Sequence, residues 1–214
     1  RGAAEALALA GGRLYGLFNN GAYGQPGALE DLPTEALKAQ FNTNLFGWHH
    51  LIRQVLPAML AVGEGRIVQN SSVLGLVAMK YRGAYNASKF ALEGYTDTLR
   101  LELEGSGVHI SLIEPGPIDT RFRANARDAF VRHIDPAQSR HQGAYRQTLT
   151  RLEKEGSTSG FTLPSEACIP PLLHALQSKR PKHRYPVTLP TRLFSILRRL
   201  LPSRWLDRIL GKSV

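Results

Sequence analysis

Short apolar runs alternate with longer amphipathic stretches along this chain. Runs of strand length lie at residues 14–18, 66–69 and 108–113, and a weaker one lies at 185–188. After the first run, apolar side chains recur every three or four positions from Thr34 onward, which predicts a long amphipathic helix. Its apolar positions are Leu37, Phe41, Leu45, Trp48, Ile52, Val55 and Met59.

Further helical patterns cover residues 84–104 and 165–177, and Pro57 should bend or end the first helix. Residues 121–160 are polar and arginine-rich, which predicts a long excursion with short helices, and an amphipathic helical tail follows Pro190. Strands that alternate with helices are typical of a parallel sheet covered by helices. The pattern therefore predicts an α/β protein with a Rossmann-like, doubly wound parallel sheet in three layers, helix–sheet–helix.

Polar clusters lie where the predicted strands end. Asn19 and Asn20 follow the first run, Ser71 and Ser72 follow the second, and residues 115–120 follow the third. Doubly wound sheets bind their ligands in the loops at the carboxyl ends of the strands. We therefore expect the chemistry of the protein at these three clusters.

The composition fits one globular domain. The chain has 214 residues, of which 43% are hydrophobic and 21% charged, so it can bury a core and is too apolar for disorder. No apolar run approaches the ~20 residues that a membrane span needs, and the first residues do not resemble a signal peptide. Cys168 is the single cysteine, so an internal disulfide is excluded and a reducing, cytoplasmic location is expected.

The net charge of +10 is concentrated toward the C-terminal end. Residues 179–214 hold ten lysines and arginines against one acidic residue, Asp207. The rest of the chain is nearly neutral, which argues against nucleic acid as a partner of the main domain.

Tyr85 and Lys89 lie four residues apart on the helix predicted over residues 84–104, so their side chains share one face. An ammonium near a phenol favours the phenolate and lowers the pKa of the phenol. A tyrosine tuned in this way can exchange a proton at neutral pH. Taken alone, the spacing also fits an ordinary exposed pair.

The pair belongs to a larger set of motifs. Ser72 precedes Tyr85 by 13 residues and follows a strand, and Asn44 lies within the long helix. The full set is Asn19-Asn20-Gly21-Ala22, Asn44, Ser72, Tyr85-Asn86-Ala87-Ser88-Lys89 and Pro115-Gly116-Pro117-Ile118-Asp119-Thr120. In order, spacing and context, this set resembles the short-chain dehydrogenase/reductase family over about residues 13–120.

The resemblance implies an oxidoreductase that moves hydride between NAD or NADP and a small-molecule alcohol or ketone. In the family, the match of Tyr85 is the general acid/base, and the match of Lys89 lowers the tyrosine pKa and holds the nicotinamide ribose. The match of Ser72 hydrogen-bonds the substrate oxygen, and that of Asn44 holds a water behind the lysine. Two donors then face the oxygen on which charge develops. Each residue also has a plainer interpretation, because Ser72 could simply end a strand and Asn44 could face solvent.

The resemblance also assigns residues to the cofactor. They are Asn20, Gly21, Tyr85, Lys89, Pro115, Gly116, Ile118 and Thr120. The family has Asn-Asn-Ala-Gly where this chain has Asn19-Asn20-Gly21-Ala22, so we expect altered backbone dihedrals at Gly21. Neither a His-Glu-x-x-His motif nor a cysteine pair occurs, so no metal is expected.

The glycine-rich phosphate loop of the family does not occur in these 214 residues, neither as Gly-x-Gly-x-x-Gly nor as Thr-Gly-x-x-x-Gly-x-Gly. We therefore expect residues 1–190 to form a partial, N-terminally truncated domain that lacks on the order of 70 residues. The choice between NAD and NADP depends on that part. An alternative function is a catalytically inactive fragment that acts as a dimerisation or interaction module. In the family, the helices that match residues 34–60 and 85–104 build a four-helix dimer interface, so a homodimer or homotetramer is expected.

Residues 191–214 are interpreted as a basic amphipathic tail that Pro202 splits into two short pieces. One interpretation is that the tail packs over the mouth of the substrate site with its arginines in solvent. The other is reversible docking on an anionic membrane, where each basic residue near the surface adds ~1 kcal/mol. Docking would suit an apolar substrate, whose pocket the excursion at 121–160 is expected to shape.

Overall fold

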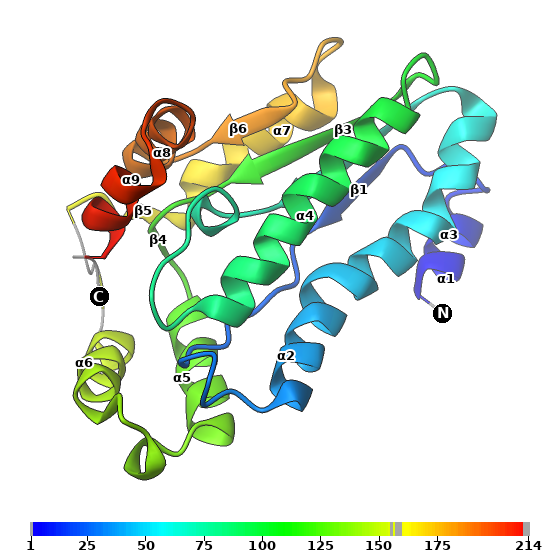
Figure 1. The fold of residues 1–214 in the computed structure, drawn as a ribbon. Helices are drawn as coiled ribbons and strands as arrows, with labels where there is room; N and C mark the ends of the chain where they lie inside the picture. The colour runs from blue at the N-terminus through cyan, green and yellow to red at the C-terminus, as the bar shows by residue number, and fades with distance from the viewer. Residues whose placement is uncertain (1, 155, 157–159, 212–214) are drawn as a thin grey trace.

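The centre of the molecule is a parallel sheet of four strands in the computed structural model, which describes residues 2–154, 156 and 160–211 (Figure 1). The strands are β1 (Gly16–Asn19), β2 (Gly65–Asn70), β3 (Val108–Glu114) and β6 (Arg184–Pro186). They lie in the order β1-β2-β3-β6. Val68 of β2 stands opposite Phe18 on one side and Ser111 on the other. All four predicted strands are confirmed, with ends that shift by one or two residues.

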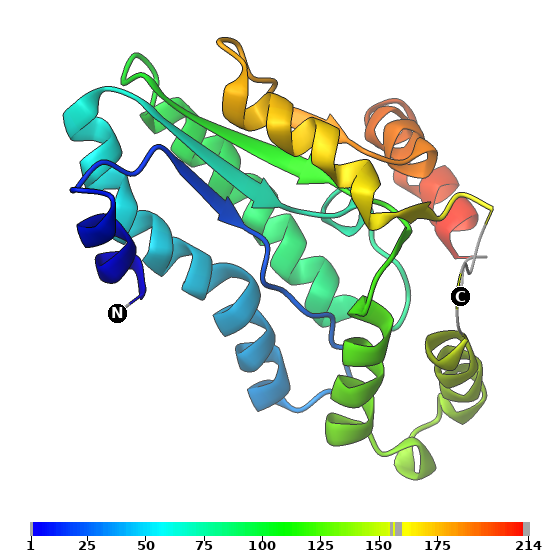
Figure 2. The same ribbon diagram turned by 180° about the vertical axis from the view of Figure 1, so that it is seen from behind.

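Helices cover both faces of this sheet. Helices α3 (Gly47–Val62) and α4 (Gly83–Glu102) lie over one face, and α7 (Ile169–Gln177) lies over the opposite face (Figures 1 and 2). The three-layer α/β architecture predicted from the sequence is therefore confirmed.

The core fills the space between these layers. On one face, Met59 of α3 and Leu99 of α4 pack against Ile67 of β2. On the other face, Val68 of β2 packs with Ala175 of α7. The two central strands are rich in isoleucine and valine because both of their faces are buried, which is typical of parallel sheets. Each fully buried side chain of this size contributes about 1.5–3 kcal/mol.

The remaining elements extend from the core. They are α1 (Gly2–Leu9), α2 (Thr34–Phe41), a π-helical turn (Asn42–Phe46), α5 (Phe122–His133), α6 (Gln142–Glu153), β4 (Ile118–Asp119), β5 (Leu163–Pro164), α8 (Leu189–Leu200) and α9 (Ser203–Leu210). Short 3₁₀ turns lie at Val73–Gly75, Pro136–Gln138 and Ser165–Cys168. The predicted excursion thus consists of α5 and α6, and the tail consists of two helices on either side of Pro202.

The first long helix differs from its prediction in two places. Pro57 does not end it, because α3 continues to Val62. Pro57 lies on the solvent side of α3, where water can satisfy the carbonyl that loses its partner, while Val55 and Met59 hold the buried side. The irregularity lies earlier, at the π-helical turn between α2 and α3.

Across the part of the chain that the structure describes, no helix has both the length and the apolar character needed to cross a membrane.

Candidate active site

Ser72 and Tyr85 approach each other from two different elements. Ser72 lies two residues after the end of β2 and is the N-cap of the 3₁₀ turn, where its Oγ accepts a hydrogen bond from the backbone N–H of Leu74 at 3.1 Å. Tyr85 lies in the first turn of α4. The side chain of Ser72 also interacts with the phenol of Tyr85 and lowers the pKa of that phenol. The structure therefore brings a hydroxyl and a phenol together at the carboxyl end of the sheet.

Lys89 completes this group one helical turn after Tyr85. Its side chain is buried, with 1% of the residue exposed. The Nζ donates a hydrogen bond to the backbone oxygen of Asn70 at 2.6 Å. The same nitrogen lies 4.6 Å from the centroid of the Trp48 ring and 5.7 Å from that of Tyr85. The buried ammonium is held by a carbonyl and two aromatic faces, an arrangement that offsets part of its desolvation.

The pKa values of this pair differ from the expectation drawn from the spacing. Burial raises the pKa of Tyr85 to about 12, although the hydrogen bond with Ser72 and the charge of Arg82 pull it down. Burial also lowers the pKa of Lys89 to about 7, and the carboxylate of Glu93 opposes that fall. A low dielectric disfavours both charged forms, and here it outweighs the effect of the ammonium on the phenol.

Asn44 lies at the centre of the π-helical turn and is fully buried, so it does not face solvent. Its Nδ2 donates to the backbone oxygen of Tyr23 at 3.0 Å and to the Oγ of Ser88 at 3.1 Å. Its Oδ1 accepts from the N–H of Tyr23 at 3.3 Å. Asn44 therefore ties the loop after β1 to the helix that carries Lys89. A π-turn at a functional position is common.

The loop after β1 reaches the same region. The Nδ2 of Asn70 donates to the Oδ1 of Asn20 at 2.6 Å, and the indole of Trp48 donates to the backbone oxygen of Gly21 at 3.0 Å. Gly21 has no positive φ, so its backbone conformation does not require glycine. The altered dihedrals expected at this position stay a prediction.

Pro115 and Gly116 lie beside the Ser72 turn. The backbone N–H of Val73 donates to the carbonyl oxygen of Pro115 at 2.7 Å. A Cβ on Gly116 would lie 2.1 Å from the Oγ1 of Thr188, so only glycine fits here. The end of β3 is thereby packed tightly between the turn that follows Ser72 and the start of α8.

Ile118 and Thr120 lie further along the chain and take part in other structure. Ile118 pairs with Leu163 in the small β4–β5 ladder, and the Oγ1 of Thr120 accepts from the N–H of Phe122 at 3.2 Å, at the start of α5. Neither has a described contact with Tyr85 or Lys89. Their assignment to the cofactor stays a prediction.

The residues gathered here fit the nicotinamide and ribose part of a dinucleotide. Lys89 presents a buried donor, and the Oδ1 of Asn70 is buried without a hydrogen-bond partner in the described structure. These groups are the kinds of donor and acceptor that ribose hydroxyls and a carboxamide require. The site can hold that end of the cofactor.

An apolar wall surrounds the phenol of Tyr85. The aromatic ring of Phe122 packs edge-on against it, with ring centroids 5.3 Å apart. The other members of this cluster are Val73, Leu74, Val77, Met79, Phe194, Leu206 and Leu210. The tail helices α8 and α9 therefore pack into the same apolar cluster as Tyr85. Their position over the mouth of a substrate site stays a prediction.

Two residues of the site were not singled out from the sequence. In the sequence, Trp48 occupies an apolar position of the first helix. Asn70 is the residue that precedes the two serines. A signal existed for both. Trp48 lies four residues after Asn44 and so shares its helix face, and Asn70 is the last residue of β2.

Similarity to known proteins decides the family. Residues 2–130 match the short chain dehydrogenase family. The chain belongs to this family. The Escherichia coli protein named uncharacterized oxidoreductase YbbO is 45% identical to this short-chain dehydrogenase over 210 residues, which are 98% of this chain and 72% of the relative. Human retinol dehydrogenase 8 is 42% identical over 119 residues, 56% of this chain and 38% of the relative.

Solved structures agree with the fold of this short-chain dehydrogenase. A short-chain dehydrogenase/reductase from Burkholderia phymatum in complex with NAD has a TM-score of 0.72 at 29% identity, and the match covers 98% of this chain and 72% of that one. One from Burkholderia cenocepacia in complex with NADP has a TM-score of 0.71 at 22% identity, over 97% and 73% of the two chains, and shows the fold alone. This chain is accordingly an oxidoreductase of a family that uses nicotinamide cofactors.

Proposed function

We propose that Tyr85 is the general acid/base in hydride transfer between a nicotinamide cofactor and an alcohol/carbonyl pair. The observation that carries the proposal is the phenol of Tyr85, which interacts with the Ser72 side chain and lies one helical turn from a buried lysine. Human retinol dehydrogenase 8, a relative by sequence, is named for an alcohol substrate. The cofactor, when bound, supplies or accepts the hydride.

Each residue of the group has a separate task in reduction of a carbonyl. Tyr85 gives its proton to the carbonyl oxygen as that oxygen gains charge, and takes the proton back in the reverse direction. Ser72 donates a hydrogen bond to the same oxygen, so two donors stabilise it. Lys89, when charged, favours the phenolate that remains and offers its ammonium to the ribose hydroxyls.

Asn44 is proposed to support the proton relay behind Lys89. Its buried amide joins the Tyr23 backbone to Ser88, and Ser88 precedes Lys89 directly. A water held beside these groups would carry the proton from the site toward solvent. Asn20, Gly21, Pro115, Gly116, Ile118 and Thr120 complete the proposed cofactor contacts.

The proposed substrate is apolar next to its reactive carbon. Around the Tyr85 phenol the side chains are aliphatic or aromatic, with Met79, Phe122 and Phe194 among them. Burying such surface favours an apolar chain or ring by roughly 25 cal/mol per Å². A polar substrate would lose its hydration without finding partners.

The test is a comparison of Tyr85→Phe with Tyr95→Phe. Tyr95 lies on the same helix, and its hydroxyl hydrogen-bonds Nδ1 of His49 at 2.9 Å, away from the site. Nicotinamide-dependent oxidation of apolar alcohols should fall by about 10²–10⁴-fold in Tyr85→Phe because the proton donor is lost. Tyr95→Phe should retain the wild-type rate.

Cofactor titration separates the enzyme from the alternative of an inactive interaction module. Reduced nicotinamide fluorescence should change on binding to the protein, and Lys89→Met should weaken that binding. Equal turnover in Tyr85→Phe and wild type would refute the role of Tyr85. A protein that binds no reduced nicotinamide would support the inactive module.

A second proposal concerns the tail, which we assign to an anionic membrane surface. Exposed apolar residues share one face of α8 at positions 189, 193, 196 and 200, and Leu200 is 72% exposed. In α9, Trp205 and Ile209 are also exposed. Exposed arginines flank them, namely Arg198, Arg199, Arg204 and Arg208.

The charge of the tail indicates which kind of partner the exposed apolar face of α8 and α9 can bind. Residues 191–214 carry six basic side chains and one acidic one, so two copies of the tail would repel each other. Anionic headgroups complement the arginines, while the apolar face of α8 enters the acyl boundary. The opposite side of the tail packs on the Tyr85 cluster, so the site would open next to the lipid.

Vesicle co-sedimentation tests this docking. Binding to mixed phosphatidylcholine–phosphatidylglycerol vesicles is expected at low salt, with less at high salt and none on phosphatidylcholine alone. Leu200→Ser combined with Trp205→Ser should abolish it. Val131→Ser is the matched control, because Val131 is 62% exposed but lies on α5. Failure to pellet with the anionic vesicles at low salt would rule the docking out.

We also propose that α3 and α4 form a homodimer interface. Apolar side chains on this side of the molecule, Phe46 and Leu101, are more than half exposed. The molar mass in solution, measured by light scattering, should correspond to two chains, and Leu101→Glu should shift it toward one.

A further inference from the structure

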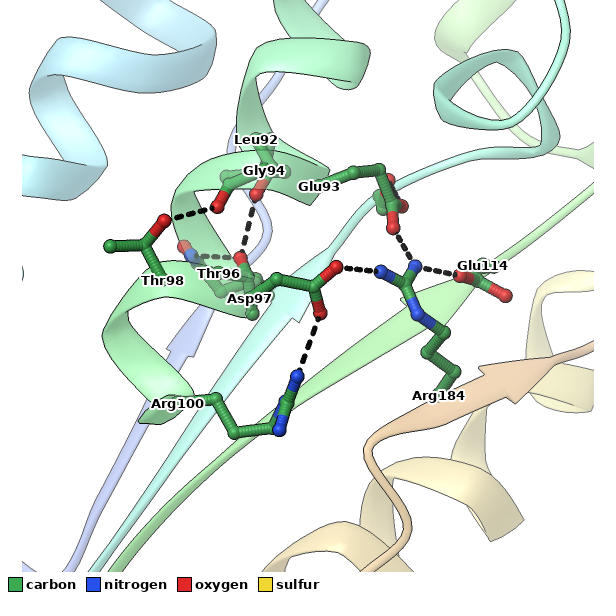
Figure 3. Close-up of polar contacts among 11 residues, drawn as sticks. Leu92, Glu93, Gly94, Thr96, Asp97, Thr98, Arg100, Glu114 and Arg184 are labelled. Atoms are coloured by element: carbon green, nitrogen blue, oxygen red, sulfur yellow. Dashed lines mark hydrogen bonds and ion pairs between the residues drawn. The ribbon is translucent and has the colours of Figure 1, made fainter. Parts of the chain in front are cut away.

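Arg184 of β6 lies among three carboxylates (Figure 3). Its Nη1 donates to Glu93 of α4 and to Oε1 of Glu114 at 2.7 Å, and its Nη2 donates to Oδ2 of Asp97 at 2.6 Å. Asp97 also pairs with Arg100 at 3.5 Å. One guanidinium therefore joins the last strand of the sheet to α4 and to the end of β3.

Two of these carboxylates are buried. Glu93 is 5% exposed and Glu114 is 1% exposed. Buried carboxylates are costly unless they are paired and hydrogen-bonded, and a single arginine cannot fully balance two. Burial and the neighbouring Glu93 raise the pKa of Glu114 to about 7. The protonated form of Glu114 is thereby favoured, which reduces the repulsion between the two carboxyl groups.

Glu93 also reaches the catalytic loop. The hydroxyl of Ser71 donates a hydrogen bond to its Oε1, and Ser71 precedes Ser72 directly. A Cβ on Gly75 would lie 2.9 Å from the Ser71 hydroxyl oxygen and 3.0 Å from the Cγ of Glu93. The 3₁₀ turn that begins at Ser72 therefore rests on the Glu93 side chain without intervening space.

The position of Glu93 along α4 brings its charge to bear on the lysine. Glu93 lies four residues after Lys89, as Lys89 lies four after Tyr85, so the three share one helix face. From the other elements, Lys89 faces the Trp48 ring of α3 and the backbone oxygen of Asn70 in β2. Glu93 is the carboxylate whose charge acts on Lys89, with Arg184 on its far side.

We propose that Glu93 is a positioning residue of the active site, which fixes the Ser72 turn through Ser71 and places its carboxylate on the helix face that carries Lys89. The proposal rests on the function proposed above. Through Arg184, the same carboxylate connects to Glu114, the residue before Pro115 and Gly116. The buried Glu93 side chain thus links the three segments that carry Ser72, Lys89 and the Pro115-Gly116 pair.

The charge effect is tested without measuring turnover. The pKa of Lys89 is followed by NMR titration of protein labelled with ¹³C at the lysine ε-carbon, with Lys89→Met assigning the signal. Glu93→Gln keeps the shape and the acceptor for Ser71 but removes the charge, so the Lys89 pKa should fall by about one unit. Asp97→Asn is the matched control. Asp97 pairs with the same arginine one turn further along α4, and its loss should leave the Lys89 pKa unchanged.

Kinetics then test the positioning effect. In Glu93→Gln, the pH profile of kcat should shift with the Lys89 pKa, whereas the profile of Asp97→Asn should keep its position. Ser71→Ala breaks the contact with the Ser72 turn and leaves the charge, so kcat should fall about tenfold with the Lys89 pKa unchanged. Thermal melting shows that each variant is folded.

The outcomes are separable. An unchanged Lys89 pKa in Glu93→Gln overturns the charge effect, and an unchanged kcat in Ser71→Ala overturns the positioning effect. Both are independent of whether Tyr85→Phe retains activity, which tests the proposed function itself. If Glu93→Gln does not fold, Glu93→Asp, which keeps the charge but is shorter, should preserve the Lys89 pKa and lose kcat like Ser71→Ala.

Discussion

Two ionic clusters hold peripheral segments to the body of this protein, and they do so in different surroundings. In the Arg184 cluster, one arginine of β6 meets Glu93, Asp97 and Glu114 in a largely buried place. In the Glu30 cluster, Arg140 of the excursion donates to both carboxylate oxygens of Glu30, at 2.6 and 2.9 Å, on an exposed surface.

The same side chain responds in opposite directions in the two clusters. The pKa of Glu30 is lowered to about 2, first by the hydrogen bonds from Arg140. The pKa of Glu114 is raised to about 7, because burial outweighs the contact with Arg184. An arginine neighbour alone therefore does not fix the pKa of a glutamate. The burial of the glutamate decides whether its charged or its protonated form is favoured.

The largest effect is expected from Arg184→Met. Without the guanidinium, two buried carboxylates lose their partner, and such a loss costs about 3–5 kcal/mol. Urea unfolding should show this loss in the free energy of unfolding, with an unchanged m-value. A variant as stable as wild type would mean that the cluster is not buried in solution.

The next expectation is a pH dependence that Glu114 causes. Its folded-state pKa lies above its usual value, so its contribution to stability is present at acidic pH and is lost as the pH rises through about 7. Glu114→Gln cannot ionise and should remove this decline. Relative to wild type, its free energy of unfolding should therefore be more favourable above neutrality than in mild acid. Identical pH dependence in the two proteins would contradict the raised pKa.

A smaller effect is expected from Tyr145→Phe, at the buried edge of the Glu30 cluster. The Tyr145 hydroxyl accepts from the N–H of Ala28 at 2.9 Å and donates to Asp31, to which Ser139 also donates at 2.5 Å. Removing the hydroxyl leaves the N–H of Ala28 unsatisfied, at a cost of about 1–3 kcal/mol. Thermal melting of Tyr145→Phe should lie between that of Arg184→Met and wild type.

The smallest effect is expected from Arg140→Ala. Its bidentate pair with Glu30 is fully exposed, and ion pairs of this kind contribute little because water and salt screen them. The melting temperature should not change measurably at physiological salt. If the melting temperature drops as far as in Arg184→Met, burial does not explain the difference between the two clusters.

Much of the fold follows from local sequence. The runs around Ile67 and Ile110 are central strands because only buried strands carry such continuous branched side chains. The spacing of Tyr85 and Lys89 on an amphipathic helix placed both on one face, and the alternation of elements put Ser72 at the same end of the sheet.

The rest depends on contacts between distant residues, which a pattern along the chain does not contain. Along the chain, Arg184 is 91 residues from Glu93 and 70 from Glu114. The sequence alone shows it only as one basic residue within a basic segment. The raised pKa of Tyr85 has the same origin, because its burial comes from Phe122 and the tail helices. Spacing could show that Lys89 lies near Tyr85, but not how little water surrounds the two.

The geometry of the proposed active site depends on the number of residues in the π-helical turn at Asn42–Phe46 as well as on their side chains. Deleting one position there would restore regular α-helical winding and change the direction in which the side chains of the turn point. Asn44 would swing away from Ser88 while its own side chain stayed intact. Evolution can exchange many side chains along this helix, yet a gain or loss of a single residue would disconnect the loop after β1 from Lys89.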